Sequence, residues 1–208
     1  MAASTKSTIL MSPGRAGLAV LVGAAGGAIF LFLFPGAAIS TLMHHVLDLP
    51  GPGAGIALVL GPVALVFMLV SSLIARRPGG ALLAALGFSV VYAALTVVLG
   101  RTTTERGMFG SGWFVLALVT CGIVADGLLL LARRLRPPWR FILAACGANA
   151  GLLVFYWIAI FPRTKGWVSW DAVPLLLVVS LAAGVVAGVV GWAISTRIPG
   201  VEAPAPKR

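Results

Sequence analysis

Six long apolar segments determine what this chain can fold into. Each has 19 to 22 residues, and about 20 residues of α-helix cross the hydrocarbon core of a bilayer, which is ~30 Å thick. Asp126 is the only charged residue inside any of them. The sequence therefore predicts an all-α, polytopic membrane protein with six transmembrane helices, forming a single membrane domain over residues 1–208. We expect the helices at residues 16–34, 56–75, 80–99, 112–132, 141–161 and 173–194.

The basic residues predict which side of the membrane each helix end faces. Eleven Lys and Arg residues lie at the two termini and in the connections 76–79 and 133–140, whereas the other connections hold four. Positive residues favour the cytoplasmic side, so both termini are expected to be cytoplasmic. The outer connections are then residues 35–55, 101–111 and 162–172. We expect a multi-pass membrane protein.

The composition excludes several functions. A net charge of +10 would suit nucleic-acid binding, but the basic residues lie at the ends of apolar segments rather than on one polar face. No P-loop motif and no pair of titratable groups at one depth occurs, so neither an ATPase nor another enzyme is predicted. No cofactor is expected.

The first outer connection, residues 35–55, has unusual chemistry. Its first part is apolar enough to lie at or dip into the membrane, and the Pro-Gly run that follows ends any helix. We interpret it as a folded loop that caps a cavity. His44, His45 and Asp48 lie in it, and a metal site there is a weak alternative to a polar, interfacial helix end.

Small residues line one face of the first helix. Ala19, Gly23 and Gly27 recur every four positions, which allows another helix to approach closely. This face either packs inside the six-helix bundle or docks on another subunit. A comparable run in the last helix, Gly184, Gly188 and Gly191, is assigned to internal packing.

Asp126 has two interpretations. A carboxylate in a transmembrane helix is a functional candidate by default. It lies about two turns from the predicted cytoplasmic end of its helix, however, so a salt bridge with Arg133 or Arg134 would give it a structural role instead. The sequence leaves the structural and the coupling role open.

The fifth segment offers the best polar and aromatic combination for a ligand. Asn149 is near mid-membrane and Tyr156 lies seven residues later on the same helix face, so an amide and an aromatic ring could hold a small planar heterocycle. The alternative is that Asn149 joins helices and the aromatic residues form an interfacial belt. Further substrate-binding candidates are Trp157, Trp113, Glu105 and Tyr92.

Three stretches of the sequence resemble a known family: the Pro-Gly-rich residues 49–55, the residues 72–83 around Arg76-Arg77-Pro78-Gly79, and the entry to the fourth helix at 109–112. The chain resembles the S components of energy-coupling factor (ECF) vitamin transporters, most closely the branch linked to hydroxymethylpyrimidine, a thiamin precursor. The resemblance covers nearly the whole chain.

The resemblance implies a substrate-binding membrane subunit of an ATP-driven importer in a prokaryotic cell membrane, not an enzyme. Such a subunit captures a vitamin or precursor outside and docks on a transmembrane T component with cytosolic ATPases. A small-residue motif on its first helix would be the docking face, here Ala19, Gly23 and Gly27. Two alternatives are a non-transporting membrane scaffold or assembly protein, and a metal-uptake S component that uses His44, His45 and Asp48.

Overall fold

The computed structural model describes residues 11–34, 41–49, 53–100, 112–160 and 170–198, apart from the side chains of His44 and Ile160. Regular structure in these residues is helical throughout. In chain order, the elements are α1 (Pro13–Leu33), η1 (Leu42–Val46), η2 (Ile56–Leu60), α3 (Gly61–Ala75), α4 (Gly80–Val98), α5 (Gly112–Leu131), η5 (Ala132–Arg134), α6 (Pro137–Phe155), η6 (Tyr156–Ile160) and α8 (Ala172–Ser195).

Six helices in this part of the chain are long and apolar enough to cross a membrane. They confirm the prediction of six spans, with η2 and α3 forming one continuous segment and η6 extending α6. Two helices begin at least three residues earlier than expected, α1 at Pro13 and α6 at Pro137. Proline lacks a backbone N–H, but the first turn of a helix needs none, so these prolines start helices rather than interrupt them.

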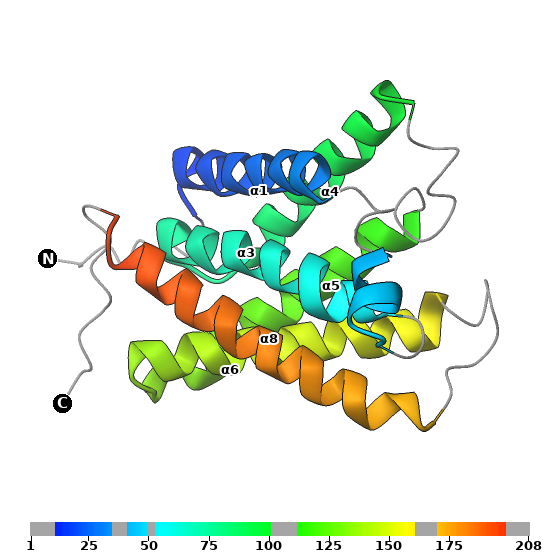
Figure 1. Ribbon diagram of the computed structural model, residues 1–208. Coiled ribbons are helices and arrows are strands. Elements are labelled where there is room, and N and C mark those ends of the chain that lie inside the picture. The colour runs from blue at the N-terminus through cyan, green and yellow to red at the C-terminus, as the bar shows by residue number, and fades with distance from the viewer. Residues whose placement is uncertain (1–10, 35–40, 50–52, 101–111, 161–169, 199–208) are drawn as a thin grey trace, which may run out of the picture.

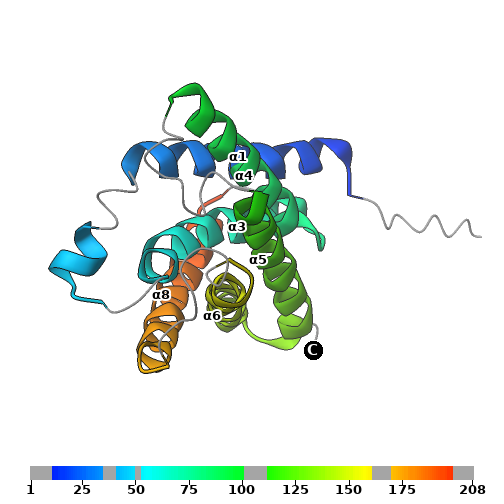
Figure 2. The same cartoon turned by 90° about the vertical axis from the view of Figure 1, so that its right-hand side faces the viewer.

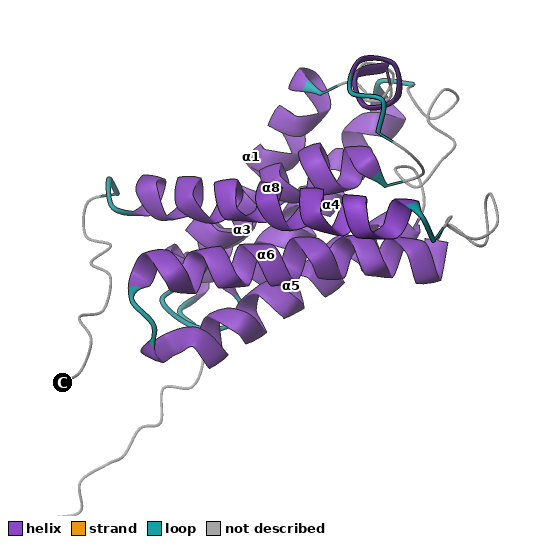
Figure 3. Cartoon of the chain, turned by 60° about the horizontal axis from the view of Figure 1, so that its bottom comes forward, coloured by secondary structure: helices purple, strands orange, loops and turns teal. Residues whose placement is uncertain are grey.

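The helices form a bundle around α3, which contacts α1, α4, α6 and α8 (Figure 1). Helix α1 lies at one edge, against α4 and α3, and α8 lies at another, against α6 and α3. Figure 2 shows η1, in light blue, to one side of the bundle, and Figure 3 shows that the described elements are helices joined by loops. The start of α1, the end of α8 and the turns 76–79 and 132–136 share one end of the molecule, here called the basic end; the opposite end is called the loop end.

Glycine residues set the closest contact, between α1 and α4. A Cβ atom at Gly23 would collide with the backbone of Ala84, and one at Gly27 with the backbone of Phe88. Helix α4 contributes a glycine as well, because Gly87 faces the Val20 carbonyl of α1. Without Cβ atoms the two backbones touch, which favours packing where no hydrophobic driving force between helices exists.

Glycine residues also bring the backbones of α6 and α8 close together. A Cβ atom at Gly184 would lie 2.6 Å from the Cα of Cys146, and one at Gly188 would lie 2.6 Å from the Cα of Ile142. The third glycine of the run, Gly191, faces Leu69 of α3. Internal packing is therefore confirmed as the role of this run.

Candidate functional site

At the loop end, Gly53, which precedes η2, lies against the end of α6 and the start of η6. Gly53 has a φ of +104°, which only glycine adopts without strain. A Cβ atom there would lie 2.7 Å from Leu153 Cδ1, 3.3 Å from Trp157 Nε1 and 3.4 Å from Tyr156 Cδ1. The segment that leads into η2 therefore lies directly over the aromatic residues predicted to bind substrate.

A second aromatic group fills the same half of the bundle between α1, α4 and α5. The ring of Tyr92 lies 4.9 Å from that of Phe114 and 5.8 Å from that of Phe30, centroid to centroid. Tyr92 is only 3% exposed, whereas Trp113, at the start of α5, is 37% exposed. Tyr92 is thus part of the packed core, and Trp113 lies at its surface.

Asn149 is fully buried and joins three segments. Its Nδ2 donates hydrogen bonds to the Ala57 carbonyl of η2 (2.9 Å) and to the Ser180 carbonyl of α8 (2.8 Å). Both amide protons are used in this way. These contacts favour the alternative in which Asn149 holds helices together.

Pro62 explains why the Ala57 carbonyl requires a hydrogen-bond donor from another helix. The N–H of Gly61 bonds to the Ile56 carbonyl, five residues back, and residue 62 is a proline without an N–H. The Ala57 carbonyl therefore has no donor within its own helix, and an unpaired carbonyl in a membrane is costly. Asn149 supplies that donor from α6. Its Oδ1 faces Gly61 and, like Ser180 Oγ, has no hydrogen-bond partner among the described residues.

Asp126 connects three helices near the basic end. Its carboxylate accepts hydrogen bonds from the backbone N–H groups of Ala81 (3.3 Å) and Leu82 (3.0 Å) at the start of α4, and from Ser72 Oγ of α3 (3.2 Å). An anion at a helix N-terminus is stabilised by the free N–H groups and the helix dipole. The expected salt bridge to Arg133 or Arg134 is thus replaced by a cap on α4, and the partners described for Asp126 are structural ones.

The expected docking face on α1 requires correction. Ala19, Gly23 and Gly27 are buried, and both glycines face the backbone of α4. In this structure these residues pack inside the bundle, as the alternative interpretation held. The exposed face of α1 carries large apolar residues instead: Leu18, Leu21, Ile29, Phe32 and Leu33.

The remaining candidates are less informative. Glu105 lies outside the described residues. His44 and His45 belong to η1, and Asp48 follows it. His45 and Asp48 are exposed, and the side chain of His44 is not described. Where side chains are described, no three His, Cys, Asp or Glu residues come together as a metal site.

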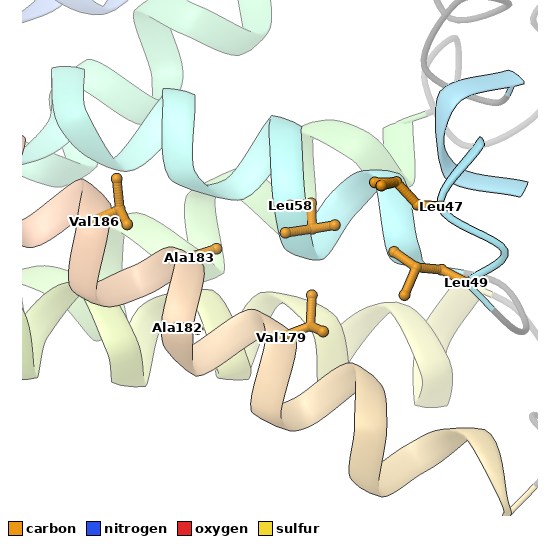
Figure 4. A pocket seen from close by; sticks show the side chains of 7 residues that line it. All are labelled: Leu47, Leu49, Leu58, Val179, Ala182, Ala183 and Val186. Carbon is orange, nitrogen blue, oxygen red and sulfur yellow. The ribbon is translucent and has the colours of Figure 1, made fainter.

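The surface of the described structure includes two cavities of similar size. The first, of about 400 Å³, is a groove with an entirely apolar lining, so its walls offer a ligand no polar side chain (Figure 4). The second, of about 430 Å³, lies at the basic end beside η5. Neither is lined by Asn149, Tyr156 or Trp157. The groove's lining residues are Leu47, Leu49, Leu58, Val179, Ala182, Ala183 and Val186.

Sequence reasoning missed the partners of the two buried polar residues. Ser72, Ala57 and Ser180 carry little signal of their own, since serine and alanine are common in membrane helices. Pro62 was the available clue, because a proline inside a span leaves a carbonyl one turn earlier without its donor. The polar residue nearest mid-membrane, Asn149, was the natural candidate to supply one.

No protein-family model matches the sequence, and no curated protein matches it. Among solved structures, the chain is similar to a crystal structure of an S-component of an ECF transporter, with a TM-score of 0.62 and 16% sequence identity. The similarity covers 90% of this chain and 85% of that one. Because the sequence identity is low, the similarity concerns the fold alone: the chain has the fold of an ECF-transporter S-component.

Proposed function

We propose that this protein is the substrate-binding membrane subunit of an ECF transporter. It captures a small molecule at the loop end, from outside a prokaryotic cell, and docks on a transmembrane T component coupled to cytosolic ATPases. A vitamin or vitamin precursor is the favoured ligand, with hydroxymethylpyrimidine first because of the resemblance in the sequence. ATP hydrolysis takes place on the other subunits.

The fold similarity over 90% of the chain is the observation that carries this proposal. The loop end adds support of a different kind. There, Gly53 lies against Tyr156 and Trp157, so the chain has a segment placed over two aromatic rings. Aromatic rings can stack on a planar heterocycle, and a covering segment can exclude water from it.

We therefore place the ligand between the segment around Gly53 and the rings of Tyr156 and Trp157. Trp157 is 8% exposed and Tyr156 is half-buried. Binding requires the backbone at Gly53 to move away from the two rings, and segments between helices move more readily than the helices they connect. Asn149 sits below these residues as a fixed support, not as the main ligand contact.

Ligand binding can be measured on the purified chain in lipid nanodiscs. A panel of vitamins and precursors, including thiamin and hydroxymethylpyrimidine, is titrated while tryptophan fluorescence and the unfolding temperature are recorded. We expect one compound class to bind, and Trp157→Phe to weaken it at least tenfold. Trp139→Phe is the matched control, because Trp139 is 64% exposed at the basic end and its replacement should leave affinity unchanged.

Assembly is tested separately, by co-purifying the chain with ECF T components and ATPases. A chain that binds no compound on the panel and recovers no such partner would be a scaffold, the alternative predicted from the sequence. Binding that disappears on adding a chelator would instead favour the metal-uptake alternative. The first outcome contradicts the proposed role, and the second contradicts a vitamin or vitamin precursor as the ligand.

A further inference from the structure

The second cavity is lined by positively charged and by exposed apolar side chains. It lies where α5 ends in the turn η5, and its lining is Leu130, Leu131, Arg133 and Arg134. Leu130 is 49% exposed and Leu131 is 80% exposed. Two arginines therefore stand directly beside two leucines that no other described element covers fully.

The arginines have no acidic counterpart in the described structure. The described carboxylates are Asp48, Asp126 and Asp171. Asp48 and Asp171 lie at the loop end, and Asp126 is bound to Ser72 and the start of α4. A cavity of about 430 Å³ with two cationic walls is thus left without an anion from these residues.

We propose that this cavity binds an anionic membrane phospholipid. The lipid phosphate would accept hydrogen bonds from the guanidinium groups of Arg133 and Arg134, whose planar forks suit phosphate oxygens. The upper part of one acyl chain would cover Leu130 and Leu131. A basic cavity at the membrane boundary next to apolar surface matches the two parts of such a lipid.

The leucines distinguish a lipid from free phosphate. A soluble anion would need the arginines only, and it would leave Leu131 in contact with water or disordered chains. A lipid uses both parts of the cavity at once. An acidic protein surface is the competing occupant, and it would not require membrane.

The test uses the full chain in mild detergent, with phosphatidylglycerol, phosphatidylcholine or inorganic phosphate added. Bound lipid is counted by native mass spectrometry and affinity is obtained by titration. We expect phosphatidylglycerol to bind tightest, and the double variant R133Q/R134Q to bind it about 30-fold more weakly, at about 1 kcal/mol per arginine. Leu131→Ser should also weaken lipid binding.

The matched control is R77Q/R197Q, which removes the same charge from two other exposed arginines at the basic end. It should retain the affinity of the unaltered protein. An equal loss of lipid affinity in the two double variants would show that only the net charge matters, and it would overturn the proposed site. Phosphate as effective as lipid, or R133Q/R134Q losing a protein partner while keeping its lipid, would overturn the proposed occupant. Circular dichroism of each variant confirms that the helices are intact.

Discussion

Replacing Asp126 by alanine should loosen the junction of α3, α4 and α5. The change removes the acceptor of two backbone N–H groups at the start of α4 and of Ser72 Oγ. Loss of a helix cap costs about 1 kcal/mol. The favourable position of a carboxylate at a helix N-terminus adds up to about 1 kcal/mol, and the hydroxyl contact adds about 0.6 kcal/mol. We expect a total loss of about 2–3 kcal/mol in the free energy of unfolding.

The assay is equilibrium unfolding in mixed detergent micelles, together with hydrogen exchange. The amides of Ala81 and Leu82 should exchange faster in Asp126→Ala, whereas amides in α8 should not change. Asp126→Asn retains one oxygen acceptor and should lose only about 1 kcal/mol. This gradation separates the loss of a cap from general damage to the bundle.

Double-mutant cycles identify the partner of Asp126. A cycle with Ser72→Ala should show a coupling of about 0.6 kcal/mol. A cycle with Arg133→Ala should be additive within about 0.4 kcal/mol, because no hydrogen bond described for Asp126 involves that residue. Stronger coupling to Arg133 than to Ser72 would refute the capping role and restore the ion pair expected from the sequence.

Three further changes test the packing. Gly23→Ala forces apart the backbones of α1 and α4 and should lower the free energy of unfolding by at least about 2 kcal/mol. Gly17→Ala, with open space around it, should be neutral or slightly stabilising in the same unfolding assay. Equal effects of the two variants would contradict the close contact. Asn149→Ala should lower the free energy of unfolding by about 2 kcal/mol. Ser180→Ala, which removes a hydroxyl without a described partner, should lower it by less than about 0.5 kcal/mol. A larger loss in Ser180→Ala than in Asn149→Ala would refute the hydrogen bonds of Asn149. Gly53→Ala strains a backbone at positive φ and collides with Leu153, so amides of η2 should exchange faster, and unchanged exchange would contradict this contact.

Much of the fold could be predicted because it depends on local composition. Helix existence and length follow from apolar runs long enough to cross a bilayer, and each predicted span appears. The errors lie at boundaries, as at Pro137, where two prolines begin α6 instead of ending the preceding turn. The same residues that break a helix interior are well suited to its first turn, so composition alone does not separate the two cases.

The candidate site was predictable only in part. The sequence predicts a loop over residues 35–55 that caps a cavity, and part of that loop lies outside the described residues. Within the described part, Gly53 lies against Tyr156 and Trp157. The partners of Asn149 and Asp126 come from segments 31 to 92 residues away in the chain. No pattern along one helix reveals such partners, since they depend on how helices are rotated against one another.

The sequence by itself determined that the chain has six spans, and its arginines predict which end faces the cytoplasm. Both follow from the free energy of transferring side chains into or across a bilayer, which acts on each segment separately. Only the tertiary structure decided that Gly23 and Gly27 face α4, that Asn149 serves the carbonyl left free by Pro62, and that Asp126 caps α4. These are contacts between segments, and close packing selects among faces that the sequence makes equally suitable.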